Sequence, residues 1–362
     1  MSYQIDIHTT NQSRLNELDF ANIPFGKVFS DHMFIADYRD GKWQNCRIEP
    51  YGRLSISPAM SGLHYGQEIF EGMKAFKDQE GNPQLFRPEM NVNRFNRSAK
   101  RMAMPDVPDE LFLEAMKKLV ALDKDWIPTG EESALYIRPF MFATDEYIGV
   151  QPSNTFRFII FTCPVGAYYT KPVSVMVSEE YVRAFPGGVG DSKVAGNYGA
   201  AMMPYTVAKE HGYNQMLWMD GYEFKYVQEI GTMNVFFRIG DTFVTPSLDE
   251  KTILEGVTRD SVIELLRDKG YNVETRRVSI DEVLEAHQQG KLKDAFGTGT
   301  AATITHIVTI GYRGTDYELP PVEKREVSTQ LKQDLQHIRT SKVSDSHNWV
   351  HKIQEEPLAV NK

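Results

Sequence analysis

The sequence has few cysteines, no excess of basic residues and no long apolar run, which argues against several classes of protein. Its 362 residues include only two cysteines, Cys46 and Cys163, in unrelated contexts and without a C-x-x-C pair, which argues against a disulfide framework and a cysteine zinc site. Asp and Glu outnumber Lys and Arg by 49 to 40, so the chain lacks the basic excess typical of nucleic-acid-binding proteins. It also lacks any run of 18 apolar residues, which argues against a membrane-spanning helix.

The start of the chain carries no recognisable targeting signal. Residues 1–20 contain neither an apolar core nor an arginine-rich amphipathic stretch, so we expect the protein in the cytoplasm. What the chain does have is an ordinary globular composition, with 41% hydrophobic and 25% charged residues. At this length such a composition predicts two domains, each large enough to bury a core.

The first half of the chain mixes strands and helices. We expect a hairpin at 31–50, helices at 88–105 and 108–128, and buried strands at 133–143 and 154–168. The apolar stripe of the second helix consists of Leu111, Met116, Leu119 and Val120. Residues 163–172 then break the pattern with two prolines and a glycine. The predicted organisation is therefore a domain at 1–167, a linker at 168–177 and a domain at 178–362.

The second half is also mixed, with hairpin-linked strands. The predicted elements are a strand at 173–177, a helix at 198–212 despite Pro204, strands at 215–220, 225–239 and 242–246, and helices at 258–270 and 279–290. Ser279 and Glu282 form a capping box at the start of the last helix. These elements predict an α+β fold.

One lysine stands in a glycine-rich segment. "PGGVGDSKVAGNYG" (186–199) holds five glycines around Lys193. A phosphate loop of the G-x-x-x-x-G-K-[ST] type fails because Ser192 and Val194 stand where a glycine and a hydroxyl are required, and a G-x-G-x-x-G fingerprint fails because Lys193 replaces its third glycine. Two interpretations remain: a solvated loop, or an amine that forms a Schiff base with a flat cofactor and needs small neighbours.

The second interpretation predicts partners for the cofactor elsewhere in the chain. On the expected strand at 225–239, alternation places Glu229 on one face with Val227, Gly231, Met233 and Val235. Glu229 is then either a solvent-facing residue of an edge strand or a carboxylate that pairs with a pyridine nitrogen. Val257 and Thr258 open a predicted helix and are suited to an anion, although Thr258 also fits a simple N-cap. The small residues of 296–307 offer a second anion site.

Together these segments resemble one family, the branched-chain amino-acid aminotransferases among the fold-type IV pyridoxal-phosphate enzymes. The resemblance rests on "GGVGDSKVAGNYG", "EIGTMNVFF", "FEGMKAF" (70–76), "LYIRPFMFA" (135–143) and "GTGTAA" (297–302), in the family's order and spacing. It extends from about Phe25 to "NWVHKI" near the C-terminus. It implies a two-domain α+β fold with mixed, mainly antiparallel sheets or a barrel and packed helices.

The resemblance also implies roles for individual residues. Lys193 would bind pyridoxal 5'-phosphate covalently and act as the catalytic base. The other implied cofactor contacts are Arg94, Val257, Thr258 and Thr300 at the phosphate, Tyr198 at the phenolic oxygen, Glu229 at the pyridine nitrogen and Leu254 against the ring. The implied substrate pocket consists of Phe25, Tyr65, Tyr136, Arg138, Tyr168, Thr232 and Ala301. From its sequence context alone, Arg94 is better explained as a surface arginine on a helix rich in basic residues.

The implied reaction is transamination between branched-chain L-amino acids and 2-oxoglutarate by a homodimer, without a metal, a nucleic acid or a membrane. Ala302 and Thr305 stand where mammalian members carry a redox C-x-x-C pair, so we expect no thiol regulation there, as in the bacterial branch. D-amino-acid aminotransferase and aminodeoxychorismate lyase share the lysine and the glutamate and remain rivals. A non-catalytic phosphate-binding module is the alternative from another class.

Overall fold

The computed structural model describes residues 3–130, 132–168 and 171–354. It divides into two compact units. The first consists of Met1–Tyr168, Lys193–Ala195 and Gln336–Lys362, and the second of Tyr169–Ser192 and Gly196–Leu335. Each unit is described by itself below.

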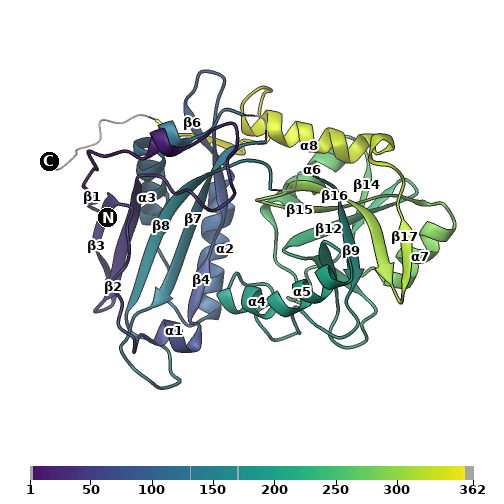
Figure 1. Cartoon of the computed structure of the whole chain (residues 1–362), viewed down its shortest axis with the longest axis horizontal. Helices are drawn as coiled ribbons and strands as arrows, with labels where there is room; N and C mark the ends of the chain where they lie inside the picture. Colours follow the sequence, from purple (N-terminus) through teal and green to yellow (C-terminus); the bar gives the residue numbers. More distant parts are fainter. Residues whose placement is uncertain (1–2, 131, 169–170, 355–362) are drawn as a thin grey trace. The chain divides into compact units, whose positions relative to one another are not determined.

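A large sheet forms the first unit (Figure 1). In spatial order its strands are β1 (Asp6–Ile7), β3 (Lys42–Pro50), β2 (His32–Arg39), β8 (Phe156–Val165), β7 (Ala134–Ala143), β5 (Met73–Lys77), β6 (Pro83–Phe86) and β18 (Val350–Lys352), while β4 (Glu68–Phe70) pairs with β7. All pairs are antiparallel except β1 with β3. The expected hairpin at 31–50 is confirmed as β2 and β3.

Helices pack on this sheet through aromatic side chains. The helices are α1 (Ser61–Tyr65), α2 (Pro88–Arg101) and α3 (Asp109–Leu122). Phe95 of α2 lies 5.3 Å from Phe112 of α3, ring centre to ring centre, and Phe112 lies 5.0 Å from Phe158 of β8. The predicted stripe of α3 is fully buried. Because three aromatic rings meet there, α2 and α3 are fixed on the sheet.

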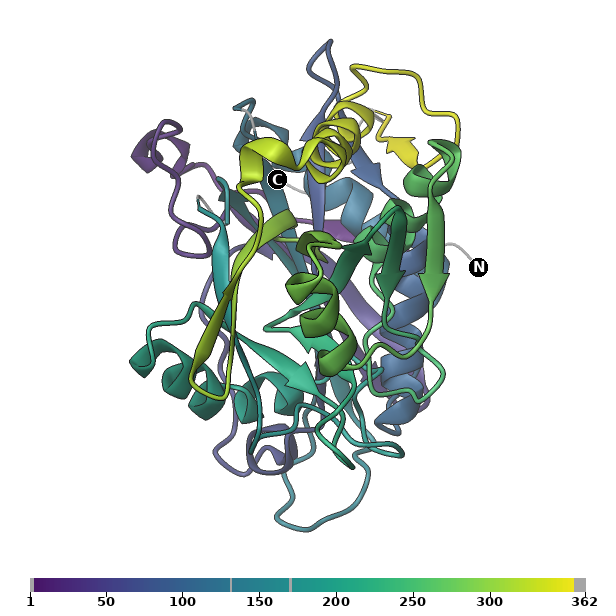
Figure 2. The same cartoon turned by 90° about the vertical axis from the view of Figure 1, so that its right-hand side faces the viewer.

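The second unit contains a closed barrel of six strands (Figure 2). Around the barrel lie β11 (Val227–Ile230), β10 (Gln215–Met219), β9 (Val173–Val177), β16 (Thr303–Tyr312), β15 (Leu292–Gly299) and β12 (Met233–Ile239), which pairs back with β11. Beyond β12 follow β13 (Thr242–Thr245) and β14 (Asn272–Thr275), and β17 (Thr315–Glu318) pairs with β16. Each barrel strand contributes apolar residues to one buried core.

The helices of this part of the chain are α4 (Ala195–Ala200), α5 (Met202–Glu210), α6 (Val257–Asp268), α7 (Ile280–Gln288) and α8 (Glu326–Arg339). The helix expected at 198–212 is thus two helices that break at Ala201, ahead of Pro204. The capping box is confirmed, because Glu282 N donates to Ser279 Oγ over 3.1 Å. None of the described helices is both long and apolar enough to span a membrane.

The division of the chain differs from the sequence prediction in two places. Residues from Gln336 onward belong to the first unit, where β18 pairs with β6. The expected linker contains β9, a strand of the barrel. Short edge strands such as β18 carry almost no periodic signal, because three residues cannot establish an alternation.

His306 makes the second unit sensitive to acid. Its Nε2 lies 2.9 Å from Ser328 Oγ of α8, and burial, together with the charges of Arg325 and Lys332, lowers its pKa to about 4. Between the ordinary histidine pKa near ~6.5 and pH 4, the unfolded chain takes up a proton that the folded chain does not. We expect the free energy of unfolding to fall over this range by no more than about 1.4 kcal/mol per pH unit from this group.

The measurement is urea unfolding at pH 7, 6 and 5. His306→Gln should lose stability less steeply on acidification than wild type, while His8→Gln, which alters an exposed histidine, should retain the wild-type slope. Equal slopes for wild type and His306→Gln would show that His306 is not the group responsible.

Candidate active site

Lys193 is held from both sides of its peptide backbone. Its N–H donates to Ser98 Oγ over 2.9 Å, and its carbonyl accepts from Phe70 N over 3.1 Å. Val194 forms a bridge to Ile69 of β4. The Lys193 side chain is half-buried, and Nζ lies 4.7 Å from the centre of the Phe70 ring. The lysine is therefore fixed against the sheet of the first unit, and its interpretation as part of a solvated loop is wrong.

A buried carboxylate follows Phe70 directly. Glu71 is fully buried and accepts from Arg94 through Nε (2.6 Å) and Nη2 (2.9 Å), and from Asn91 Nδ2 (2.9 Å). Burial acts to raise the pKa of Glu71, but the charges of Arg94 and Lys193 and these hydrogen bonds outweigh it, so the pKa lies below its usual value. Arg94 itself is buried, so the interpretation of Arg94 as a surface arginine is wrong.

Four of the predicted substrate-pocket residues contact one another in the first unit. Phe25 lies edge-on to Tyr136 at 5.5 Å and to Tyr168 at 4.7 Å between ring centres. Arg138 Nη2 donates to the hydroxyl of Tyr136 over 3.0 Å. Tyr65, at the end of α1, is 41% exposed. It is not part of this contact set.

Gly72 gives Tyr136 its room. A Cβ at position 72 would lie 2.1 Å from the Tyr136 hydroxyl oxygen, far inside van der Waals contact. The glycine of "FEGM" is thus required for the tyrosine to reach Arg138.

The second unit contains a pocket with about 380 Å³ of empty space, open on one side. Its walls are Arg183, Ser192, Asn197, Tyr198, Ala201, Glu229, Gly231, Thr232 and Leu254. The pocket brings together four residues that the sequence predicted: Tyr198, Glu229, Thr232 and Leu254. Ser192, also in the wall, directly precedes Lys193 in the chain.

The setting of Glu229 corrects the sequence prediction. The expected strand at 225–239 is two strands, because Gly231, with φ of +52°, and Thr232 turn the chain back on itself. Glu229 consequently faces Asn234 across the β11–β12 pair, whereas Met233 and Val235 belong to the barrel core. The carboxylate is buried, which rules out the solvent-facing edge residue. The alternation rule fails here because it assumes one continuous strand.

Two groups hold the Glu229 carboxylate. Arg183 forms an ion pair with it, Nε to Oε2 at 2.6 Å, and Asn234 Nδ2 donates to Oε1 over 3.1 Å. Arg183 is itself fixed by the carbonyls of Gly190 and Thr252, to which Nη2 donates. The sequence analysis did not find Arg183, since a single arginine in an irregular segment carries no pattern.

Asn234 also connects Glu229 to the start of α6. Its Nδ2 donates to the carbonyl of Leu254 over 2.8 Å. Gly256 is the N-cap of α6 and packs so closely that a Cβ there would lie 2.0 Å from Asn234 Oδ1. Thr258 lies inside the first turn, so its interpretation as the N-cap is wrong. The N-cap glycine has no side chain that could cap the helix, and the first backbone N–H groups of α6 are of the kind that binds an anion.

The loop between β15 and β16 borders the same face of the barrel. Thr298 of β15 pairs directly with Asn234, so their side chains share one face. Thr298 Oγ1 is buried and has no hydrogen-bond partner among the described residues. Thr300 and Ala301 follow in the partly buried turn that joins the two strands. Glu229, Asn234 and Thr298 thus give this face the polar groups that a bound ligand requires.

Comparison with known proteins assigns the chain to a family. The profile described as amino-transferase class IV matches residues 68–310, more than half of the chain. The chain belongs to this family. Branched-chain-amino-acid aminotransferase 2 of Bacillus subtilis is 44% identical over 335 residues, covering 91% of this chain and 92% of that protein. A probable branched-chain-amino-acid aminotransferase of Staphylococcus epidermidis is 45% identical over 336 residues, covering 91% and 93%.

Solved structures of class IV aminotransferases share the fold. The branched-chain amino acid aminotransferase of Escherichia coli has a TM-score of 0.72 at 24% identity, covering 90% of this chain and 99% of that chain. The T.th. branched-chain amino acid aminotransferase complexed with N-(5'-phosphopyridoxyl)-L-glutamate has a TM-score of 0.69 at 26% identity, covering 88% and 98%.

The cofactor of class IV aminotransferases is pyridoxal 5'-phosphate, and the residues present fit it. A buried carboxylate in a pocket suits a protonated ring nitrogen, and Glu229 supplies it. The start of α6, with a glycine as its N-cap, and the buried Thr298 hydroxyl, which has no hydrogen-bond partner among the described residues, suit a phosphate. Within the described residues, no cluster of three or more His, Cys, Asp or Glu side chains is arranged for a metal ion.

Arg183 offers a direct test of this site. We expect Arg183→Gln to lower kcat at saturating cofactor by about tenfold or more, ~1.4 kcal/mol, because the buried Glu229 loses the positive charge beside it. Arg183→Lys should restore part of the rate. The control is Arg313→Gln, which removes an exposed ion pair with Glu179 and should leave kcat unchanged. Wild-type kcat in Arg183→Gln would contradict a role for this ion pair.

Proposed function

We propose that this chain transfers the amino group of branched-chain L-amino acids to 2-oxoglutarate, with pyridoxal 5'-phosphate bound. The observation that carries the proposal is the pocket that unites Tyr198, Glu229, Thr232 and Leu254 beside the residue preceding Lys193. The relatives at 44–45% identity carry the branched-chain aminotransferase name, which supports the choice of substrate.

The chain's residues divide the work of holding the cofactor. Bound pyridoxal phosphate supplies an aldehyde for the amino group and a ring that accepts electrons while the Cα–H bond breaks. Arg94, Thr300 and the backbone N–H groups of Val257 and Thr258 would hold its phosphate. Tyr198 would hydrogen-bond the phenolic oxygen, and Leu254 would cover one ring face.

Glu229 and Lys193 have the two protonic roles. The Glu229 carboxylate would hold a proton on the pyridine nitrogen, and Arg183 keeps that carboxylate charged and oriented. Lys193 Nζ would bind the cofactor covalently, then, once released by the incoming amine, accept the proton from the substrate Cα and return it on the cofactor side. The same steps in reverse would convert 2-oxoglutarate to glutamate.

The remaining residues would select the substrate. Phe25, Tyr65, Tyr136 and Tyr168 would form an apolar wall that suits leucine, isoleucine and valine, with Thr232 and Ala301 lining the rest. Arg138, whose guanidinium lies beside the Tyr136 hydroxyl, would pair with the second carboxylate of 2-oxoglutarate or glutamate. An apolar wall with one cation at its edge explains how one pocket accepts both substrate types.

The first test combines a variant with a choice of substrate. Lys193→Ala should lower turnover by about 10³-fold or more and abolish the covalent attachment that borohydride makes permanent. The control Lys209→Ala changes an exposed lysine of α5 and should retain both. Wild-type enzyme should lose its yellow colour with L-leucine and keep it with D-alanine. Bleaching by D-alanine alone would instead indicate a D-amino-acid aminotransferase, and a colourless protein a phosphate-binding module.

We further propose a cytoplasmic homodimer. In the first unit, α1 and residues 144–150 lie side by side, because Ser61 N donates to the carbonyl of Asp145 and Tyr147 N to that of Ala59. They expose Leu63, Ile148 and Val150 to 58%, 61% and 89%. A cluster of exposed apolar side chains of this kind is typical of a surface that another molecule covers.

The dimer is tested by charge. The double variant Ile148→Asp/Val150→Asp should shift the sedimentation coefficient from that of a dimer to that of a monomer, since it places two charges in the interface. Val343→Asp, at an exposed valine in another segment, is the control and should leave the dimer intact. A wild-type protein that sediments as a monomer would overturn the proposal.

A further inference from the structure

The segment that carries Phe25 is a loop with little of its own to hold it. Among residues 15–29, all of them described, Leu18 is the one buried residue. The regular structure of the loop is a single turn of 3-10 helix at Leu15–Glu17. A loop of this kind samples many conformations unless its two ends are fixed. The position of Phe25 therefore depends on what joins the ends.

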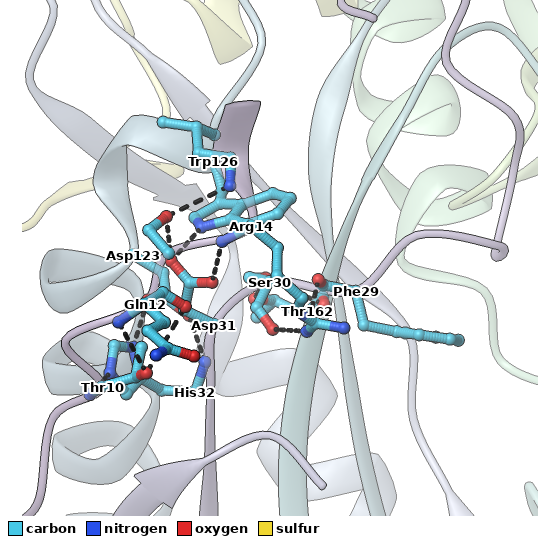
Figure 3. A network of polar contacts seen from close by, with 12 residues as sticks. Thr10, Gln12, Arg14, Phe29, Ser30, Asp31, His32, Asp123, Trp126 and Thr162 are labelled. Carbon is cyan, nitrogen blue, oxygen red and sulfur yellow. Dashed lines mark hydrogen bonds and ion pairs between the residues drawn. The ribbon is translucent and has the colours of Figure 1, made fainter. Parts of the chain in front are cut away.

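A polar network joins them (Figure 3). Asp31, after the loop, accepts from Ser13 Oγ over 2.6 Å and from Arg14 N over 3.0 Å, both before the loop. Arg14 Nη2 returns across the same gap and donates to the carbonyls of Phe29 and Ser30, each over 3.1 Å. We call this set of contacts between Ser13, Arg14 and residues 29–31 the neck. Because Asp31 accepts from the first segment and the Arg14 side chain binds carbonyls of the second, the two segments of the neck are held in a fixed alignment.

The neck is in turn anchored to the body of the first unit. Trp126 Nε1 donates to Asp31 Oδ2 over 3.0 Å, so the carboxylate accepts from three groups in two segments, residues 13–14 and Trp126. His32 is held next to it: Nδ1 lies 2.6 Å from Asp123 Oδ1, and Nε2 accepts from Thr10 N over 3.1 Å. Burial acts to raise the pKa of Asp31, but the hydrogen bonds of Ser13, Arg14 and Trp126 outweigh it and lower that pKa, so the carboxylate is charged at neutral pH.

At the far end of the loop, Phe25 reaches the aromatic wall. Its ring contacts Tyr136 and Tyr168. Gly26 has φ of +68° and so turns the chain where a side chain is strained. These contacts are few compared with those of the neck. A loop that opens at the neck loses them together.

We propose that Asp31 and Arg14 are positioning residues for the substrate: by closing the neck they hold Phe25 against Tyr136 and Tyr168, and so set the fit of the branched side chain. The proposal rests on the proposed function, because it takes Phe25 as part of the substrate wall. Neither residue touches the substrate. Their effect on catalysis runs through Phe25 alone.

That last statement is tested by a double-mutant cycle. Asp31→Asn keeps the size of the side chain but weakens the neck, and should lower kcat/KM for L-leucine by about tenfold, mainly through KM, with the cofactor absorption unchanged. In a Phe25→Ala background the same Asp31→Asn change should alter kcat/KM by less than about twofold, because the residue it positions is gone. Asp19→Asn, within the loop and bonded to Ala21 N, is the matched control and should equal wild type.

Trypsin provides a readout that does not depend on activity. Lys27 lies in the loop and is exposed, but cleavage requires the segment to open, so Asp31→Asn should be cut there about tenfold faster than wild type or Asp19→Asn. Arg14→Gln removes the hydrogen bonds to the Phe29 and Ser30 carbonyls and should also be cleaved about tenfold faster than wild type. It replaces Asp31→Asn if that variant does not fold.

Equal effects of Asp31→Asn with and without Phe25 would overturn the proposal, as would an unchanged kcat/KM or an unchanged rate of cleavage. An enzyme that is inactive with L-leucine even as wild type would overturn the proposed function, while the trypsin rates would still decide whether the neck holds the loop.

Discussion

Burying a carboxylate costs free energy unless hydrogen bonds or a positive charge compensate it, and the ion pair between Glu229 and Arg183 provides that compensation in the pocket of the second unit. The tight turn at Gly231 and Thr232 places Glu229 opposite Asn234. Asn234 in turn binds the segment that leads into α6. Asn234 thus contacts the Glu229 carboxylate and the start of α6, and it pairs with Thr298 at the end of β15. These three features therefore lie on one face of the barrel.

The first unit also contains a buried carboxylate that is compensated by an arginine. Glu71 is fully buried and is matched by Arg94 with two hydrogen bonds. The contribution of Lys193 to the lowered pKa of Glu71 shows that the amine is close enough for their charges to interact. An arginine that is preorganised by a buried carboxylate presents its guanidinium in a fixed orientation, which suits a planar match to a phosphate better than a mobile surface arginine does.

Much of this fold follows from local patterns in the sequence. The hairpin of β2 and β3, the stripe of α3 and the capping box of α7 were predicted because each depends on residues close together in the chain. The turn at Gly231 was missed because the residues on both sides are equally suited to one long strand, and barrel closure, a long-range constraint, decides between the two. The cofactor contacts are proposed from the family's motifs, since spacing alone left Lys193 undecided.

Arg183 and the neck around Asp31 could not be predicted by the same route, and the motif "FEGMKAF" contains Glu71 without revealing its role. Each is a polar residue whose partner stands at least ten residues away in the chain, and no periodicity marks such a pair. What they share is that each holds a predicted residue in place: Arg183 pairs with Glu229, Glu71 pairs with Arg94, and Asp31 fixes the ends of the loop of Phe25. Chemistry fixes the identity of the groups that touch a cofactor, whereas many different arrangements can hold those groups in place. The residues behind these groups therefore set their orientation without taking part in the reaction.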